Sequence, residues 1–230
     1  MRKIYLLLSI FVFCICEAQN PAEVDPSFNQ FYSPLGNYFV QSKVYKTVVD
    51  TNDKLYLLVT NIDDGVSLTA PKREIVKLNN NIFENNILFD NGSILDFKVQ
   101  SDGKILVYGT FTSYDSQPVK NIVRFNPDFT LDSSFDLDSS ITITFTYGIN
   151  VGNGLFVQSD DKIIIVGGIN CVQGTKSFIR INEDGSFDNS FNSAVVEQVD
   201  HIVAMQNDNK LLVSLYNSSS SSNPGRVFRL

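Results

Sequence analysis

Short apolar runs that follow a polar cluster recur along the chain. The clearest copy covers 99–109, with the sequence VQSDGKILVYG, and the next covers 157–167, with VQSDDKIIIVG. Weaker copies cover 49–58 and 205–213. The polar cluster predicts a hairpin turn, because Asp tolerates turn geometry and Gly adopts positive φ without steric cost. The β-branched run after it predicts a short strand that is buried on both faces.

The lysine that ends each polar cluster sets the period of the repeat. The four lysines are Lys54, Lys104, Lys162 and Lys210, at spacings of 50, 58 and 48 residues. A second apolar pattern has its basic residue 18 to 23 positions after each lysine: IVKLN at 75–79, IVRFN at 122–126, FIRIN at 178–182 and VFRL at 227–230. Its length and polar boundaries predict a second strand in each unit.

A third pattern, in which an aspartate precedes a phenylalanine, closes some of the units. It reads LDSSF at 131–135 and FDNSF at 187–191, with a detached copy, DPSF, at 25–28. We expect the recurring phenylalanines to form wedges between adjacent units. These residues are Phe28, Phe89, Phe135 and Phe191.

A unit of about 50 residues with three or four short strands has the size of one β-propeller blade. Such a unit cannot bury both of its faces alone, so neighbouring units must stack. The sequence therefore predicts an all-β fold, a β-propeller-like array of about four blades that is incomplete or open. A β-solenoid is the alternative, although its coils are usually shorter than this period, and a β-sandwich is the third choice.

The predicted repeat domain spans 19–230. Its units cover roughly 29–89, 90–135, 136–191 and 192–230, and the third unit carries an insertion near 136–154. The last unit stops where the others continue with Asn and a turn. We expect this unit to be truncated, so that the remaining repeats of a longer chain are partners of the domain. The alternative is ring closure, in which the copy at 25–28 completes the last unit.

Residues 1–18 have the features of a signal peptide. Two basic residues precede an apolar run over 4–15, and small residues stand at Cys16 and Ala18. The run is shorter than the roughly 20 residues of a membrane-spanning helix, so no transmembrane segment is expected. We expect export to the extracellular space or the cell surface, with the periplasm as the alternative. Lipidation at Cys14 or Cys16 competes with simple cleavage, but neither cysteine follows the small residues usual before a lipidation site.

Acidic residues exceed basic ones, with 25 Asp and Glu against 18 Lys and Arg and a net charge of −7. No basic cluster is present to displace phosphate counterions, which argues against a nucleic-acid partner. Cleavage after Ala18 would leave Cys171 as the only cysteine, so no intramolecular disulfide is expected. Cys171 follows an apolar run, and we expect it to be a small buried residue.

The aspartates of the repeat have structural explanations. Five of them fall in the predicted hairpin turns: Asp53, Asp102, Asp160, Asp161 and Asp208. Asp132 and Asp188 are expected to cap nearby backbone amides. The stretch 182–188 lacks the oxygen spacing and the closing Glu of a calcium loop, and His201, the only histidine, lies in a predicted exposed strand. The sequence therefore predicts no catalytic residue, no metal site and no cofactor.

The connection between the two strongest strands varies most from unit to unit. It covers 61–72, 113–120, 170–176 and 217–225. Variable loops on a regular scaffold commonly carry binding sites. The candidate ligand-binding residues are Tyr114, Asp115 and Gln117 in the second connection and Tyr147 in the insertion, with a protein or a glycan as the ligand.

The string VQSDGKILVYGTFT at 99–112, with IVRFN and LDSSF after it, resembles the delta-60 repeat. The resemblance extends over nearly all of the chain after residue 18 and is strongest over 97–135 and 155–191. It implies an exported bacterial protein built from propeller-like repeats, often within a large surface or secreted protein. The resemblance implies no particular activity, because none is common to the family.

These observations favour a binding or adhesion module, or a scaffold, and not an enzyme. A polysaccharide-acting hydrolase or lyase is an alternative, which predicts two carboxylates about 5 to 9 Å apart in one pocket. A structural spacer of a larger surface protein is another alternative, which predicts nothing beyond the repeat.

Overall fold

The computed structural model of the chain describes residues 43–60, 72–79, 82–144, 154–191, 199–215 and 227–229. These residues form sixteen strands and no helix, and all of them lie in the compact unit Tyr32–Leu230. The predicted signal peptide at 1–18 and the copy at 25–28 lie outside the described residues. Within the described ranges, the prediction of an all-β fold is confirmed.

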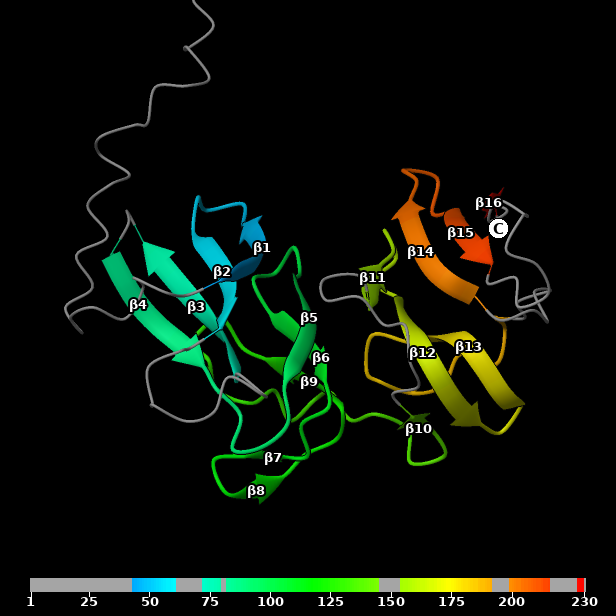
Figure 1. The fold of residues 1–230 in the computed structure, drawn as a ribbon, viewed down its shortest axis with the longest axis horizontal. Helices are drawn as coiled ribbons and strands as arrows, with labels where there is room; N and C mark the ends of the chain where they lie inside the picture. The colour runs from blue at the N-terminus through cyan, green and yellow to red at the C-terminus, as the bar shows by residue number, and fades with distance from the viewer. Residues whose placement is uncertain are drawn as a thin grey trace, which may run out of the picture. The chain divides into compact units, whose positions relative to one another are not determined.

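Four antiparallel sheets follow one another along the chain, and each contains the hairpin of one repeat lysine (Figure 1). Sheet 1 has the strand order β1 (Val44–Val49), β2 (Leu55–Thr60), β3 (Arg73–Asn79), β4 (Ile82–Ile87). Sheet 2 has the order β5 (Ile94–Val99), β6 (Ile105–Gly109), β9 (Ile122–Phe125). Between β6 and β9, a small hairpin forms from β7 (Ser113–Tyr114) and β8 (Gln117–Pro118).

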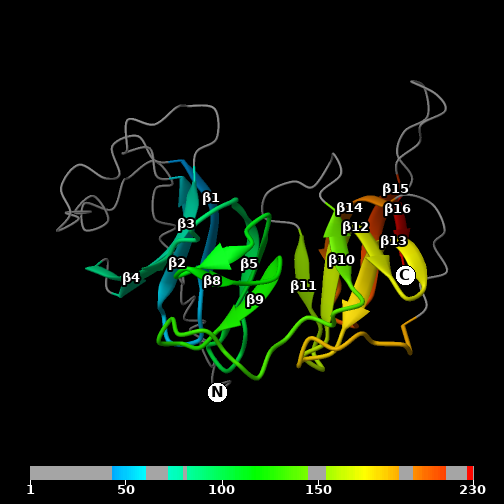
Figure 2. The same ribbon diagram turned by 90° about the horizontal axis from the view of Figure 1, so that it is seen from below.

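Sheet 3 is built on the long strand β12 (Ile163–Cys171), which pairs with β13 (Gly174–Ile181) along one edge. The other edge of β12 pairs with β11 (Leu155–Val157) in its first half and with β10 (Thr142–Thr144) in its second half (Figure 2). Part of the inserted segment therefore extends the sheet. Sheet 4 consists of β14 (Val199–Met205), which contains His201, β15 (Leu211–Leu215) and β16 (Val227–Arg229).

The predicted hairpin turns share one backbone conformation. In sheet 2, the Gly103 N–H donates to the Gln100 carbonyl at 3.0 Å and the Gln100 N–H donates to the Lys104 carbonyl at 2.8 Å. This is a three-residue loop, which requires positive φ at its last residue. The residues at this position have φ of 58°, 82°, 59° and 62°, and they are Asp53, Gly103, Asp161 and Asn209.

Successive residues of the central strands pack on opposite sides of their sheet. In β6, Ile105 and Val107 belong to an apolar cluster shared with sheet 1, whereas Leu106 and Tyr108 belong to a cluster shared with sheet 3. Strand β12 divides its residues in the same way between sheets 2 and 4. Because both faces are covered by neighbouring sheets, β6 and the first half of β12 are apolar without interruption, as the sequence predicts.

Three of the predicted wedge phenylalanines lie between successive sheets. Phe89 lies in the cluster between sheets 1 and 2 and stacks on Phe111, with ring centroids 3.6 Å apart. Phe135 lies in the cluster between sheets 2 and 3, and Phe191 packs against the cluster between sheets 3 and 4. Phe28 lies outside the described residues. The described chain is therefore a β-propeller-like array of stacked sheets, and this predicted fold class is confirmed.

Cys171 differs from its prediction because it is only half-buried. It ends β12 beside the turn that leads into β13, and its Sγ lies 3.3 Å from the Gly174 carbonyl oxygen. The strand continues past the edge of the apolar cluster between sheets 2 and 3, so only part of the side chain packs against it.

Candidate functional site

A cluster of charged side chains connects the closing pattern at 131–135 to the strands of sheet 2. The Nε of Arg124 donates to Oδ2 of Asp132 at 2.6 Å, and the Nζ of Lys104 lies 3.2 Å from the same oxygen. The other carboxylate oxygen of Asp132 accepts from the amide and the hydroxyl of Ser134, at 2.9 and 2.6 Å. Arg124 also donates to the carbonyl of Glu183, in the turn that follows β13 of sheet 3, at 2.8 Å. The cluster therefore joins three segments of one repeat to each other and to the next sheet.

Sheet 3 repeats this cluster. The Nε of Arg180 donates to Oδ2 of Asp188 at 2.7 Å, and the Nζ of Lys162 lies 3.0 Å from that oxygen. Asp188 accepts from the amide and the hydroxyl of Ser190, at 2.9 and 2.6 Å. The lysine, the arginine and the aspartate of the repeat thus meet in space in both sheets.

Hydrogen bonds keep these carboxyl groups ionised. Burial alone would raise the pKa of Asp132, but hydrogen bonds from Ser134, Arg124 and Lys104 outweigh burial and hold the pKa well below its usual range. The pKa of Asp188 is lowered in the same way. A group whose pKa lies far from neutrality is a poor general acid or base. The two carboxylates are therefore better suited to a structural role as hydrogen-bond acceptors. Their predicted role as caps of backbone amides is confirmed.

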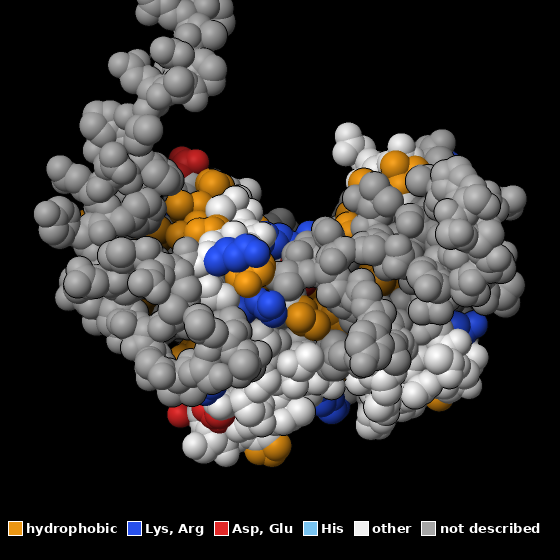
Figure 3. Space-filling view, viewed as in Figure 1, with side chains coloured by type: hydrophobic (Ala, Val, Ile, Leu, Met, Phe, Trp, Pro, Cys, Tyr) orange, Lys and Arg blue, Asp and Glu red, His pale blue; other side chains and the backbone are white. Residues whose placement is uncertain are grey.

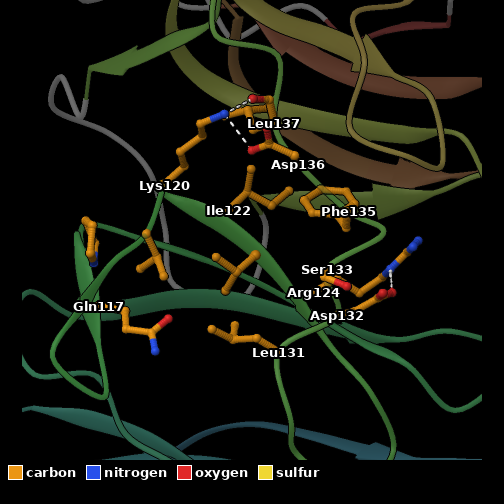
Figure 4. Close-up of a pocket in the computed structure, with 13 residues that line it drawn as sticks. Gln117, Lys120, Ile122, Arg124, Leu131, Asp132, Ser133, Phe135, Asp136 and Leu137 are labelled. Atoms are coloured by element: carbon orange, nitrogen blue, oxygen red, sulfur yellow. Dashed lines mark hydrogen bonds and ion pairs between the residues drawn. The ribbon is translucent and has the colours of Figure 1, made fainter.

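A pocket of about 500 Å³ lies beside β9 (Figure 4). Its walls come from β8, from the connection between β8 and β9, from β9 itself and from the segment 131–137. The ion pair between Arg124 and Asp132 is part of this lining. A second ion pair, between Lys120 and Asp136 at 2.6 Å, stands across Ile122 from the first pair. Charged pairs therefore frame the pocket.

The pocket has an apolar floor and a polar rim. Ile122 and Phe135 of the floor are 1% and 8% exposed, whereas the side chain of Asp136 is 83% exposed. Gln117 and Ser133 are exposed and also line the pocket. An amide, a hydroxyl, an ammonium and a carboxylate are thus available around an apolar surface.

Sheet 3 has a much smaller pocket at the equivalent place. Its volume is about 10 Å³, and its lining includes Phe178 and Phe187. The corresponding residues of sheet 2 are Ile122 and Leu131. Because phenylalanine rings fill more of a packed interior than these aliphatic side chains, the pocket of sheet 3 is nearly closed.

The predicted ligand-binding residues have different positions. Gln117 lines the pocket. Tyr114 instead packs its ring against two phenylalanine rings, at centroid distances of 5.0 and 5.4 Å. Asp115 has a φ of 47° and forms the tight turn of the small hairpin together with Ser116. Tyr147 lies outside the described residues.

Sequence reasoning missed Lys120, Ser133 and Asp136 as pocket residues. Lys120 ends a variable connection, Ser133 lies in the closing pattern at 131–135, and Asp136 directly follows that pattern. A comparison of corresponding positions in the two strongest units contains a usable signal. Ile122 and Leu131 of sheet 2 correspond to Phe178 and Phe187 of sheet 3. These two exchanges of an aliphatic for an aromatic residue mark where the pockets of the two units differ in volume.

A second group of charged side chains joins three sheets. Lys46 on β1 lies 2.5 Å from Oδ1 of Asp96 on β5, and the Leu155 amide on β11 donates to Oδ2 at 2.9 Å. Asp96 is fully buried. Burial, together with the charge of Lys46, lowers the pKa of the neighbouring Lys98 to about 8. Figure 3 shows Lys and Arg side chains gathered over β1 and β5.

The described ranges contain no cluster of three or more His, Cys, Asp or Glu side chains suited to a metal ion. In the same ranges, no helix has the length and hydropathy needed to cross a membrane.

Comparison with known families finds a match. A family model described as a domain of unknown function, the DUF5122 β-propeller, matches residues 100–135 and 158–191. Each stretch contains the lysine hairpin, the arginine strand and the closing aspartate and phenylalanine of one sheet. The match supports a β-propeller-like repeat family, while the delta-60 resemblance stays a prediction. No curated protein and no solved structure matches the chain.

Proposed function

We propose that this β-propeller-like chain is an exported binding module whose ligand occupies the pocket beside β9. The difference between sheets 2 and 3 carries the proposal. Both sheets contain the same cluster of lysine, arginine and aspartate, yet the pocket volumes are about 500 and 10 Å³. The open space is therefore not needed to build the sheet. Its volume lies within the roughly 300–1,000 Å³ of typical ligand pockets.

The lining favours a glycan as the ligand. Gln117 and Ser133 offer neutral donors and acceptors, and Lys120 and Asp136 add charges of both signs at the rim. Phe135 adds an aromatic side chain at the floor. A sugar ring has hydroxyl groups at its edge and apolar C–H groups on its faces. A polar rim above an apolar floor matches both.

Export is part of the proposal because of the N-terminal pattern. A basic start, an apolar run and small residues at Cys16 and Ala18 are typical of a cleaved signal peptide. Export to the cell surface or beyond would bring the pocket into contact with surface and secreted glycans.

The test is binding to a panel of immobilised glycans, followed by calorimetry with the best ligand. Leu131→Phe introduces the residue that sheet 3 has at the corresponding place, and it should weaken binding at least tenfold by filling the pocket. The matched control, Phe187→Leu, alters the nearly closed pocket of sheet 3 and should leave the affinity unchanged. Circular dichroism should show that both variants keep the β structure of the parent.

Three outcomes would contradict the proposal. Unchanged glycan affinity in Leu131→Phe would place the ligand outside this pocket. Cleavage of the glycan during incubation, detected by mass spectrometry, would indicate the polysaccharide-acting enzyme instead. If no glycan binds and a displayed peptide library yields binders that Leu131→Phe weakens, the ligand is a protein.

A further inference from the structure

We propose that the pocket beside β9 selects uncharged glycans over acidic ones, and that Asp136 is the residue that determines this selection. Because the selection rests on the proposed function, it concerns the class of glycan that the same pocket accepts. The lining contains two basic side chains, Arg124 and Lys120, and two acidic ones, Asp132 and Asp136. Which of these four side chains a ligand can use depends on the bonds that each already makes within the protein.

The ion pair between Arg124 and Asp132 is not available to a ligand. The Nε of Arg124 donates to Asp132, its Nη1 donates to the Glu183 carbonyl at 2.8 Å, and its Nη2 donates to the Ser134 hydroxyl at 3.1 Å. Both carboxylate oxygens of Asp132 have partners as well. The side chains of Arg124 and Asp132 are 3% and 7% exposed. A guanidinium group this buried and this well bonded is a poor partner for an acidic ligand.

Lys120, at the rim, is also bonded to the protein. Its Nζ donates to Oδ1 of Asp136 at 2.6 Å and to the carbonyl of Leu137. The Lys120 side chain is 39% exposed, so a ligand can approach it. An acidic group would reach this ammonium only beside the carboxylate of Asp136, which repels it. A neutral hydroxyl group meets no such cost.

The main chain holds Asp136 in place. Its N–H donates to the Asp184 carbonyl at 3.0 Å, and the Asp138 N–H donates to the Gly185 carbonyl at 3.0 Å. Gly185 has a φ of 93°, and a Cβ at this position would collide with the Asp136 carbonyl. The segment that contains Asp136 therefore packs closely on the turn after β13. Little ordering of this segment is needed when a ligand binds, which favours affinity.

Three polar groups of the lining are free to bind a ligand. Among the described residues, Oδ2 of Asp136 accepts no hydrogen bond, and the side chains of Gln117 and Ser133 form none. The Asp136 side chain is 83% exposed. Figure 4 shows Gln117 and Asp136 on opposite sides of Ile122, so a sugar ring over Ile122 would lie between them.

The free carboxylate oxygen of Asp136 distinguishes neutral from acidic sugars. A carboxylate oxygen only accepts hydrogen bonds, and a bond to this charged acceptor is stronger than one between neutral groups. A sugar hydroxyl can donate such a bond. The carboxylate of a uronic acid cannot donate, and its charge is repelled. The same side chain thus favours the neutral ligand and disfavours the acidic one, which is how specificity commonly arises.

The experiment is calorimetric titration of the full chain with pairs of oligosaccharides that differ only at C6. Each pair contains an oligomer of glucose, galactose or mannose and the uronic acid form of the same oligomer, in which C6 is a carboxylate. Asp136→Asn keeps the shape of the side chain and removes its charge. Asp160→Asn, at an exposed hairpin turn of sheet 3 outside the pocket, is the matched control.

The wild type and Asp160→Asn should bind the neutral member of at least one pair about tenfold tighter than the acidic member, as expected for one hydrogen bond to a charged group. Asp136→Asn should bind the neutral member about tenfold more weakly than the wild type does. Its preference for the neutral member should shrink or reverse, because Lys120 is then free to pair with the acidic one.

The contrary outcomes separate this selection from the pocket itself. Equal or tighter binding of the acidic member by the wild type would overturn the selection. An unchanged preference in Asp136→Asn, while Leu131→Phe still weakens binding, would overturn the role of Asp136 and leave the pocket as the binding site. If no oligosaccharide binds the wild type, or if Leu131→Phe leaves the affinity unchanged, the proposed function fails and the selection fails with it.

Discussion

Asp132 shows how one side chain can account for the spacing of a whole repeat. One carboxylate oxygen accepts hydrogen bonds from the amide and the hydroxyl of Ser134, and the other forms ion pairs with Arg124 and Lys104. The lysine of the hairpin, the arginine of the second strand and the closing aspartate recur together because they meet at one point.

Sheet 1 departs from this pattern, and its structure shows the consequence. Lys77 stands where sheets 2 and 3 have arginine, and its Nζ lies 3.0 Å from Glu84 on β4. The outer edge of β3 is covered by the full strand β4, which pairs along its length. The cluster of lysine, arginine and aspartate thus occurs in sheets 2 and 3. In these sheets the segment after β9 or β13 forms a single β-bridge with that strand and no full strand.

We predict that Asp132→Asn strongly destabilises the protein. The change leaves Arg124, which is 3% exposed, without its counter-charge. Loss of one partner of a buried ion pair costs about 3 kcal/mol or more. Urea unfolding at pH 7 measures the loss, with Asp128→Asn, at an exposed turn, as the control. An equal effect of the two substitutions would show that the buried pair has no special weight.

The same variant has a predicted pH dependence. The pKa of Asp132 is lowered in the folded state, so its contribution is fully present above the unfolded pKa of about 4 and is lost as pH falls below it. The stability difference between the wild type and Asp132→Asn should therefore be constant from pH 7 to about pH 5 and shrink below pH 4. A constant difference down to pH 3 would contradict the assignment.

The lysine hairpins depend on one backbone position. Asp53, Gly103, Asp161 and Asn209 occupy it with positive φ, and these are the residue types that tolerate the left-handed region best. The same turn geometry thus forms in four different sheets, because the requirement for positive φ depends on the turn residue itself and not on its neighbours.

We predict that Gly103→Ala costs about 1 kcal/mol more than Gly103→Asn, because a left-handed conformation penalises Ala more than Asn. A Cβ at this position would lie 3.3 Å from Cγ of Pro127, so both variants share the same small steric adjustment. Chemical unfolding of both variants measures the difference. Equal stabilities would show that the turn relaxes to negative φ.

At the scale of the whole molecule, stacked apolar faces and a few polar bonds hold the sheets together. The Tyr108 hydroxyl on β6 donates to the Val166 carbonyl on β12 at 2.9 Å, and the tyrosine is fully buried. Burial, together with the charge of Asp96, raises the pKa of Tyr108, so the hydroxyl keeps its proton as a donor. This bond is one of the polar links between sheets 2 and 3.

We predict that Tyr108→Phe destabilises the protein by about 1–3 kcal/mol, because the Val166 carbonyl loses its buried donor. Tyr56→Phe is the matched control, since the Tyr56 hydroxyl makes a longer bond of 3.4 Å within sheet 1. Urea unfolding measures both losses. A loss in Tyr56→Phe as large as in Tyr108→Phe would contradict the role of the inter-sheet bond.

The candidate pocket was only partly predictable. Variation among the connections identified the loop that contains Gln117, because loop variability is visible in the sequence alone. The same reasoning chose Tyr114, whose ring turns inward to an aromatic cluster. Loop variability did not identify Lys120 and Asp136, because their ion pair forms only when the segment 131–137 lies beside β9.

The sequence by itself determined the repeat, its strands, its turns and the β-propeller-like class. These follow from local chemistry: positive φ at one turn residue, β-branched runs of strand length, and a period that requires stacking. Tertiary structure decided which charges meet, that β10 joins the edge of β12, and that the pocket is open in sheet 2 but nearly closed in sheet 3. These outcomes depend on side-chain volumes and contacts between residues distant in sequence.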